Sequence, residues 1–207
     1  MKNRTDHVFF ETDADCFCAG TRLLTEYGDI AVEVVQIGDL LVTIREGGPP
    51  VGRVVWTGRR QIDISRHPHP ESIWPVRINA GAFAPHIPMR NLRLSPGHAI
   101  YMDGVLFEAA ALVNGTSIVR ETEAQIVTYH HVELENHDVL LAEGLPAESF
   151  SGDRAMFEGA GPLVLHPDFA QSGPRCLPLI TEGKLLEDMR RVLTFRASRR
   201  TREEVQL

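Results

Sequence analysis

The sequence predicts an all-β domain that spans residues 16–150 of the 207-residue chain. Short runs rich in β-branched and aromatic residues recur at regular spacing, and Gly or Pro turns separate them. Asp103-Gly104, with an apolar run on each side, is the strongest hairpin signal in the chain. A helical spacing of apolar residues lies beyond residue 180. The expected fold class is therefore all-β with a short C-terminal helical tail.

The elements of the first half follow from runs of apolar residues and the turns that separate them. Gly28-Asp29 is the expected turn of the first hairpin, and Thr57-Gly58 is expected to interrupt the third element. The run Gly47-Gly48-Pro49-Pro50 ends the second element. In order, we expect a hairpin of residues 21–25 with 30–33, a strand over 40–44, a bulged hairpin over 51–65 and a strand over 74–78.

The second half begins with a loop over residues 79–91, which Pro85 and Pro88 close. In order, the elements that follow are a strand over 92–94, the hairpin of 99–102 with 105–108, and last strands over 125–135 and 139–142. No internal repeat and no low-complexity tract is present in the sequence.

Three segments are expected: a leader over residues 1–15, the domain itself, and an extension over residues 151–207. The extension begins with an irregular stretch over 151–180. A helix is predicted over 183–197, because its apolar residues fall on one face, and the charged end from Arg196 is expected to fray. These apolar residues are Leu185, Leu186, Met189, Val192 and Leu193. They indicate a docked helix more than a partner-binding surface.

Composition limits the partners and compartments that the chain can have. The net charge of −7 argues against nucleic acid as the main partner, since phosphate binding needs clustered Lys and Arg. Three cysteines are too few for a disulfide framework, so we expect a reducing compartment. No apolar run is long enough to span a bilayer, and the first residues do not form a secretory signal. The chain is therefore expected to be cytoplasmic, without a cofactor or metal ion.

The chemistry-bearing residues occur in four separated blocks. The blocks are Cys16-Phe17-Cys18-Ala19-Gly20-Thr21, Ser95-Pro96-Gly97-His98, Tyr129-His130-His131 and the run from His137 to Gly144. A thiol at the start of a domain, with distant imidazoles that folding can bring to it, is the arrangement that cysteine nucleophile chemistry needs.

In this order, the blocks resemble those of the Hint (hedgehog/intein) superfamily, and within it the bacterial Hint domains that stand apart from true inteins. The block at Cys16 is similar to the family's Cys-x-x-x-Gly-Thr start. The block at His98 is similar to its Thr-x-x-His block, with Ser for Thr, and the run from His137 is similar to a segment near the end of inteins. The resemblance covers about residues 16–150 and implies a horseshoe-like β fold.

The resemblance also implies a self-processing reaction at the bond between Asp15 and Cys16. The Cys16 thiolate would attack the carbonyl of Asp15 and move the acyl group from nitrogen to sulfur. His98 would protonate the leaving nitrogen, and Ser95 would hold the scissile region by a hydrogen bond. His131 stands where many inteins have an Asp, and it could deprotonate Cys16 or activate the second nucleophile.

The end of the domain departs from the intein pattern. Inteins finish with His-Asn before a Cys, Ser or Thr, whereas Gly144 is followed by Leu145-Pro146-Ala147-Glu148-Ser149-Phe150. We therefore expect N-terminal cleavage or acyl transfer without splicing. The substrate would be the chain's own N-terminal segment, and the acceptor would be water, a thiol or an amine. The Asp15 carboxylate could also attack the neighbouring thioester from within.

Several of these residues have other interpretations. Cys18 is either a packed side chain or, with Cys16, part of a weak metal clamp, and Cys176 is expected to be structural. Only one of His130 and His131 can face the site, because neighbouring side chains alternate across a strand. The resemblance favours His131, and it gives His137 a possible accessory role. Solvated side chains are expected at His67, His69 and His86, and a His-rich metal site is the alternative interpretation.

Two other functions are compatible with the same sequence. One is a catalytically silent module of the Hint fold that serves as a binding or appendage unit. The other is a thiol hydrolase that acts on a separate substrate. Intact mass after expression, with and without Cys16→Ala, distinguishes a self-processing chain from a silent one.

Overall fold

The computed structural model describes residues 15–44, 50–152, 154, 158–160 and 175–204. The expected leader apart from Asp15, most of the predicted break over 47–50 and most of the irregular stretch over 151–180 lie outside these residues. The described residues form mainly antiparallel β structure with one C-terminal helix, α1 (Lys184–Glu204). The predicted all-β fold with a helical tail is confirmed.

The strands join into one hydrogen-bonded path. Their bounds are β1 (Phe17–Cys18), β2 (Arg22–Thr25), β3 (Gly28–Ala31), β4 (Leu40–Val42), β5 (Val51–Asp63), β6 (Val76–Ile78), β7 (Leu92–Leu94), β8 (Ala99–Met102), β9 (Val105–Glu108), β10 (Ile118–Arg120), β11 (Ile126–Leu134), β12 (Val139–Ala142), β13 (Leu145–Glu148) and β14 (Glu158–Ala160). The spatial order is β10-β6-β7-β1-β11-β5-β4-β2-β12-β13-β8-β9, with β14 beside β5 and β3 beside β2.

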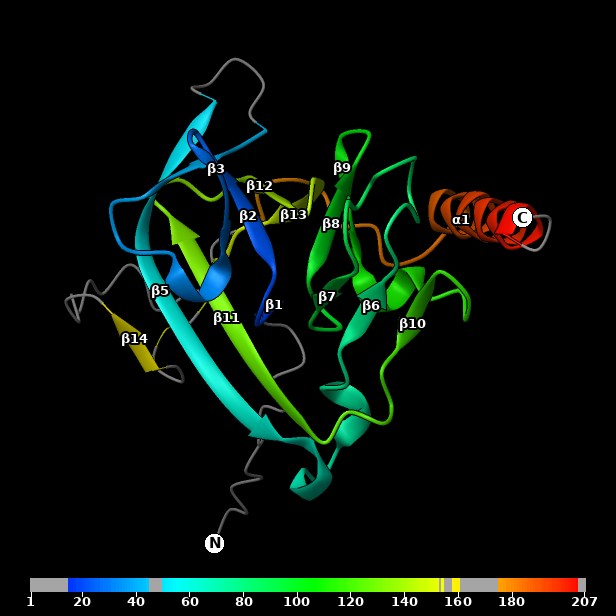
Figure 1. Ribbon diagram of the computed structural model, residues 1–207, viewed down its shortest axis with the longest axis horizontal. Coiled ribbons are helices and arrows are strands. Elements are labelled where there is room, and N and C mark those ends of the chain that lie inside the picture. Colours follow the sequence, from blue (N-terminus) through cyan, green and yellow to red (C-terminus); the bar gives the residue numbers. More distant parts are fainter. Residues whose placement is uncertain (1–14, 45–49, 153, 155–157, 161–174, 205–207) are drawn as a thin grey trace, which may run out of the picture.

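The long antiparallel pair β5–β11 forms one side of the molecule, and α1 lies on the opposite side (Figure 1). The two-residue strand β1 pairs with both β11 and β7, so the start of the described chain lies in the interior of the sheet. Four short 3-10 helices connect strands among the described residues: Val32–Val34, Ile64–Arg66, Pro70–Ser72 and Ala109–Leu112.

The core gathers apolar side chains from nearly every strand. Phe17, Leu23, Leu94 and Phe107 are fully buried in its main cluster, as is Val132 on β11. From α1, the apolar side chains of Leu186, Met189 and Leu193 pack against this cluster. The other two residues of the predicted apolar face, Leu185 and Val192, are 49% and 53% exposed, so only part of that face is docked on the domain. No helix in the described part of the chain has both the length and the apolar character that a membrane span requires.

The prediction of a bulged hairpin over residues 51–65 is wrong. These residues contain the single 13-residue strand β5, which continues through Thr57-Gly58 and pairs with β11 along most of its length. Gly58 is explained by packing, because a Cβ there would lie only 2.2 Å from the Trp56 ring. The register shift in this pair occurs opposite Glu133 and Leu134, not at the glycine.

Smaller corrections concern turns and ends. The predicted first hairpin exists, but its turn is at residues 26–27, and Gly28 already pairs with Thr25 as part of β3. Strand β12 is not the last of the domain. Glu143 and Gly144, both at positive φ, turn the chain into β13, which pairs with β12 and β8. The helix also continues past Ala197 to Glu204, where the sequence predicts fraying.

Candidate active site

Strand pairing brings Cys16 to His131 on β11. Phe17 pairs with His130 in an antiparallel register, which places Cys16 opposite His131. Since side chains alternate along a strand, His131 points to the thiol, and His130 points to the other face, towards Glu33. The Sγ atom of Cys16 lies 3.3 Å from the Nε2 atom of His131.

Aromatic rings enclose this thiol–imidazole pair. Cys16 is 4% exposed and His131 is fully buried. The Phe150 ring packs edge-on against His131 at 4.8 Å between centroids, and Trp56 lies 6.3 Å away. Burial and, to a smaller extent, the nearby His98 lower the pKa of His131 to about 3, while the backbone of Asp15 opposes the shift. His131 is therefore neutral near pH 7 and has a ring lone pair that can accept the thiol proton, while its burial disfavours the charged form that results.

Ser95 holds the peptide nitrogen of Cys16. The Cys16 N–H donates to the Ser95 Oγ at 3.1 Å, and the Ser95 N–H donates to the Cys16 carbonyl at 3.0 Å. The side chain of Ser95 is thus in direct contact with the nitrogen that an acyl shift would release. A hydroxyl can accept from this N–H before such a reaction and donate to the nitrogen afterwards.

His98, the last residue of the block that begins with Ser95, packs against Phe17. The His98 ring is fully buried, and its centroid is 4.4 Å from that of Phe17. Its ring nitrogens make no standard hydrogen bond with any residue in the described part of the chain. Burial lowers the pKa of His98 to about 4, an effect that the backbone of Cys16 partly opposes, so this ring is also neutral near pH 7.

The side chain of Asp15 enters a separate polar cluster beside the Asp15–Cys16 peptide bond. Asp15 Oδ1 accepts the N–H of Ala99 at 3.3 Å and lies 3.4 Å from Nη1 of Arg175. Arg175 also donates to Glu148, which is fully buried. Burial and the charge of Glu148 raise the pKa of Asp15 to about 7, although Arg175 and His137 lower it.

His137, for which the resemblance implies an accessory role, belongs to the polar cluster of Asp15 and not to the thiol–imidazole pair. Its Nε2 lies 3.0 Å from Oε1 of Glu148. Sequence reasoning missed Ala99, Glu148 and Arg175. Arg175 lies far along the chain in a stretch that the sequence predicts to be irregular, where no motif marks it.

Cys18, the second residue of β1, faces a small cluster with Tyr129, Ile64 and Val127. Burial raises the pKa of this thiol to about 12, which keeps it protonated. Among the hydrogen bonds of the described residues, none joins Cys18 to His131 or His98. The placement fits a packed side chain.

Among the residues that the structure describes, one group of side chains has metal-ligand spacing: ligand atoms of His137, Glu148 and Cys176 all lie within 4.8 Å of one another. The Arg175 guanidinium already pairs with Glu148, so a divalent ion there would have a fixed positive charge beside it. Cys176 contacts Glu148 through its Sγ at 3.6 Å. Of the histidines in the Pro-rich segment, His69 is exposed beside Glu71, and His67 is half-buried near it.

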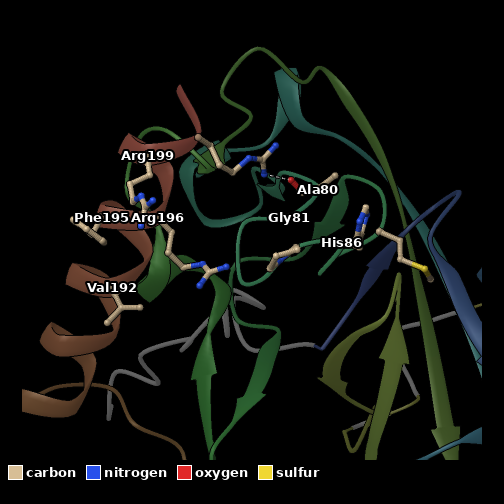
Figure 2. A pocket seen from close by; sticks show the side chains of 10 residues that line it. Ala80, Gly81, His86, Val192, Phe195, Arg196 and Arg199 are labelled. Atoms are coloured by element: carbon tan, nitrogen blue, oxygen red, sulfur yellow. Dashed lines mark hydrogen bonds between the residues drawn. The ribbon is translucent and has the colours of Figure 1, made fainter. Parts of the chain in front are cut away.

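A cavity of about 670 Å³ lies between α1 and the loop after β6 (Figure 2). Its lining includes Val192 and Phe195 from the helix and His86 from the loop, where His86 has a φ of +62°. Arg200 reaches across to donate to the carbonyl of Ala80. None of the residues around Cys16 lines this cavity, so it is separate from the candidate site.

Solved structures of similar shape have low sequence identity to this chain. They include a bacterial intein-like domain from Clostridium thermocellum, with 13% identity and a TM-score of 0.40, covering 65% of this chain and 98% of that one. The MchDnaB-1 intein has 16% identity and a TM-score of 0.44, covering 64% and 98%. The AceL NrdHF class 3 split intein, a splice-inactive variant, has 13% identity and a TM-score of 0.41, covering 65% and 97%.

A search of curated proteins gave no match to this chain. In contrast, the family model described as "Hint domain" matches residues 15–154, which is more than half of the sequence. The match begins at Asp15, directly before the thiol, and includes Ser95, His98 and His131. The chain belongs to the Hint domain family.

Proposed function

We propose that this chain cleaves its own peptide bond between Asp15 and Cys16 through a thioester and does not splice. The observation that carries the proposal is the 3.3 Å approach of the Cys16 Sγ to the His131 Nε2, within a buried site. A thiol next to a neutral imidazole is the arrangement that generates a nucleophilic thiolate. The peptide bond to be attacked begins at the same residue, so nucleophile and substrate are already in place.

In the first step, His131 accepts the thiol proton, and the sulfur forms a bond with the carbonyl carbon of Asp15. The bond from that carbon to the Cys16 nitrogen then breaks, and the nitrogen takes up a proton to become an amine. We assign this delivery to His98, which first receives from His131 the proton taken from the thiol. A charge on His98 disfavours a charge on His131, so in the proposed step only one of the two rings carries the proton at a time.

Ser95 acts as a positioning residue in this step. Its Oγ accepts the N–H of the scissile peptide and fixes the nitrogen relative to the thiol. As the nitrogen becomes an amine with a lone pair, the same hydroxyl can donate to it. The hydrogen bond between Ser95 and the Cys16 nitrogen is thus kept after the reaction, with the hydroxyl as donor instead of acceptor.

In the second step, water, a thiol or an amine attacks the thioester carbonyl. The carbon–sulfur bond breaks, the Cys16 thiol is restored, and residues 1–15 leave as an acid, a thioester or an amide. The absence of splicing is supported by β13, which incorporates the segment after Gly144 into the sheet between β12 and β8. That segment has no His-Asn dipeptide to cyclise.

We place the reaction in the reducing cytoplasm, without a cofactor and without a nucleic-acid partner. The sparse and odd count of three cysteines supports the reducing compartment. The net charge of −7 supports the absence of a nucleic-acid role.

The test is the intact mass of purified chain over time, with and without dithiothreitol. Release of residues 1–15 should accelerate with the thiol and stop in Cys16→Ala, while the matched Cys18→Ala variant should retain it. A folded wild-type chain that stays at full mass, with Cys16 reactive to a thiol probe, would support a silent Hint module instead. Release that persists in Cys16→Ala would point to an outside protease.

A further inference from the structure

The side chain of the residue before the scissile bond has a binding site of its own. Asp15 is only 7% exposed, and its Oδ1 accepts the backbone N–H of Ala99 and meets the guanidinium of Arg175. A buried carboxyl group is costly unless polar partners replace the lost water. Here the partners come from two distant parts of the chain, 84 and 160 positions away from Asp15.

Arg175 is itself held in place by a fully buried acid. Glu148 on β13 accepts from Arg175, and its second oxygen lies 3.0 Å from Nε2 of His137. Glu148 is 0% exposed, whereas the Arg175 side chain is 25% exposed. The guanidinium is therefore fixed between two carboxyl groups, one belonging to the body of the domain and one belonging to the scissile peptide.

We propose that this cluster is a subsite that selects a short acidic side chain at position 15, with Arg175 as the residue that recognises its carboxylate. The proposal rests on the self-cleavage proposed above, and it names the substrate class of that reaction. The subsite combines the N–H of Ala99, the guanidinium of Arg175 and the support of Glu148.

The physical basis of selection is the cost of leaving these donors without an acceptor. With Ala at position 15, the Ala99 N–H and Arg175 would face a buried space without a partner. With Glu, an extra methylene would have to fit where the side chain is almost fully enclosed. With Lys, a second positive charge would lie beside Arg175. Asn would keep an acceptor for Ala99 and lose only the charge, so it should be the mildest change.

Binding at this subsite affects the reaction through the backbone. Ala99 directly follows His98, so the N–H that holds Asp15 belongs to the same segment that carries the proton donor. On the other side, the Cys16 N–H is held by Ser95. The carboxylate of Asp15 and the nitrogen of Cys16 are thus fixed by one segment, residues 95–99. Loss of the carboxylate should misplace the scissile bond relative to His98.

The experiment compares the cleavage rates of the wild-type chain and of the variants D15N and D15A. The cleavage rate of each of these three proteins is measured with Arg175 present and again in an Arg175→Gln background. Dithiothreitol is in excess, so that release does not depend on an internal attack by the Asp15 carboxylate. With Arg175 in place, D15A should slow release by roughly 10-fold and D15N by less. In Arg175→Gln, the ratio of the Asp15 rate to the D15A rate should fall to about 3 or less.

This ratio separates recognition from a merely structural role. A loss of folded protein in Arg175→Gln lowers both rates together and leaves their ratio unchanged. The matched control is Arg154→Gln, since Arg154 is a similarly half-buried arginine that pairs with Glu133 and has no contact with Asp15 among the described hydrogen bonds. In that variant, the preference for Asp15 should stay at its wild-type value.

Each outcome decides one claim. A chain that releases residues 1–15 with the same Asp-to-Ala ratio in Arg175→Gln as in the wild type overturns the subsite, while the proposed function stands. A wild-type chain that releases nothing in dithiothreitol overturns the proposed function. A ratio that drops in Arg175→Gln and is preserved in Arg154→Gln supports both.

Discussion

The Nε2 atom of His131 lies 3.3 Å from the Sγ atom of Cys16, although the two residues are 115 positions apart in the sequence. The contact depends on the antiparallel register in which Phe17 pairs with His130. A shift of that register by one residue would present His130 to the thiol instead. The thiol and the imidazole are therefore positioned by backbone hydrogen bonds and not by flexible side chains.

The proposed role of His131 as the base predicts a large effect of its removal. His131→Gln keeps a polar side chain of similar size but cannot take the thiol proton. We expect thiol-induced release of residues 1–15 to slow by roughly 100-fold or more. The matched control is His130→Gln, one position along β11 on the opposite face, which should change the rate by less than about 3-fold. Equal rates for His131→Gln and wild type, measured by mass spectrometry, would remove His131 from the mechanism.

The position of Ser95 at the nitrogen of the proposed scissile bond predicts that the release rate depends on its hydroxyl. Ser95→Ala removes the acceptor of the Cys16 N–H and should slow release by about 10-fold. Ser95→Thr keeps the hydroxyl and should restore most of the rate. If Ser95→Ala cleaves as fast as wild type while remaining folded by circular dichroism, the hydrogen bond has no part in the reaction.

His98 is expected to matter for the breaking of the carbon–nitrogen bond. His98→Ala should slow release by roughly 100-fold, because the leaving nitrogen then lacks its proton donor. The readout is the release rate in excess dithiothreitol, with the thermal midpoint measured in parallel, since the substitution also leaves space beside Phe17. A variant that stays folded and releases at the wild-type rate would show that the proton reaches the nitrogen by another route.

Burial of the two imidazoles predicts how stability depends on pH. The pKa values of His98 and His131 are lowered to about 4 and about 3, so both rings are neutral in the folded chain while they become charged in the unfolded chain below their ordinary pKa. The unfolded state then binds more protons, and the free energy of unfolding falls as the pH falls. Asp15 has the opposite effect on the free energy of unfolding, which it makes rise as the pH falls. Its raised pKa makes the folded state bind a proton that the unfolded state releases.

Urea denaturation in a Cys16→Ala background, in which the proposed mechanism predicts no cleavage, checks these signs between about pH 6 and about pH 5. His98→Gln should reduce the slope of unfolding free energy against pH by up to ~1.4 kcal/mol per pH unit. Asp15→Asn should increase the slope by a similar amount. Slopes that move in the reverse directions would contradict these pKa shifts.

Much of the site can be predicted from the sequence because its residues lie in short blocks. Cys16, Ser95 and His131 all belong to these blocks, and the structure places Ser95 and His131 in contact with Cys16. The alternation of side chains along a strand is enough to separate His131 from His130. The blocks do not indicate the cluster around Asp15, because Arg175 and Glu148 meet it through the tertiary fold alone.

The errors in the predicted fold have specific physical causes. Local pattern predicts a break at Gly58, but this glycine allows the Trp56 ring to lie against the backbone of a continuous strand. Pro146 argues against a strand when only the sequence is considered, but in β13 it occupies a paired position opposite Leu141. Glycine and proline usually mark strand ends in a local sequence pattern. Whether Gly58 and Pro146 end a strand or lie within one depends on neighbours that are distant in sequence.

The most direct test of the thioester mechanism is to trap the acyl group. Purified chain is incubated with hydroxylamine at neutral pH, and the mass of the released N-terminal segment is measured. A thioester at Cys16 predicts release of residues 1–15 as the hydroxamate of Asp15, with the fragment absent in Cys16→Ala. A released segment that carries a free carboxylic acid at Asp15 regardless of hydroxylamine, and that forms equally in Cys16→Ala, would contradict the thioester mechanism.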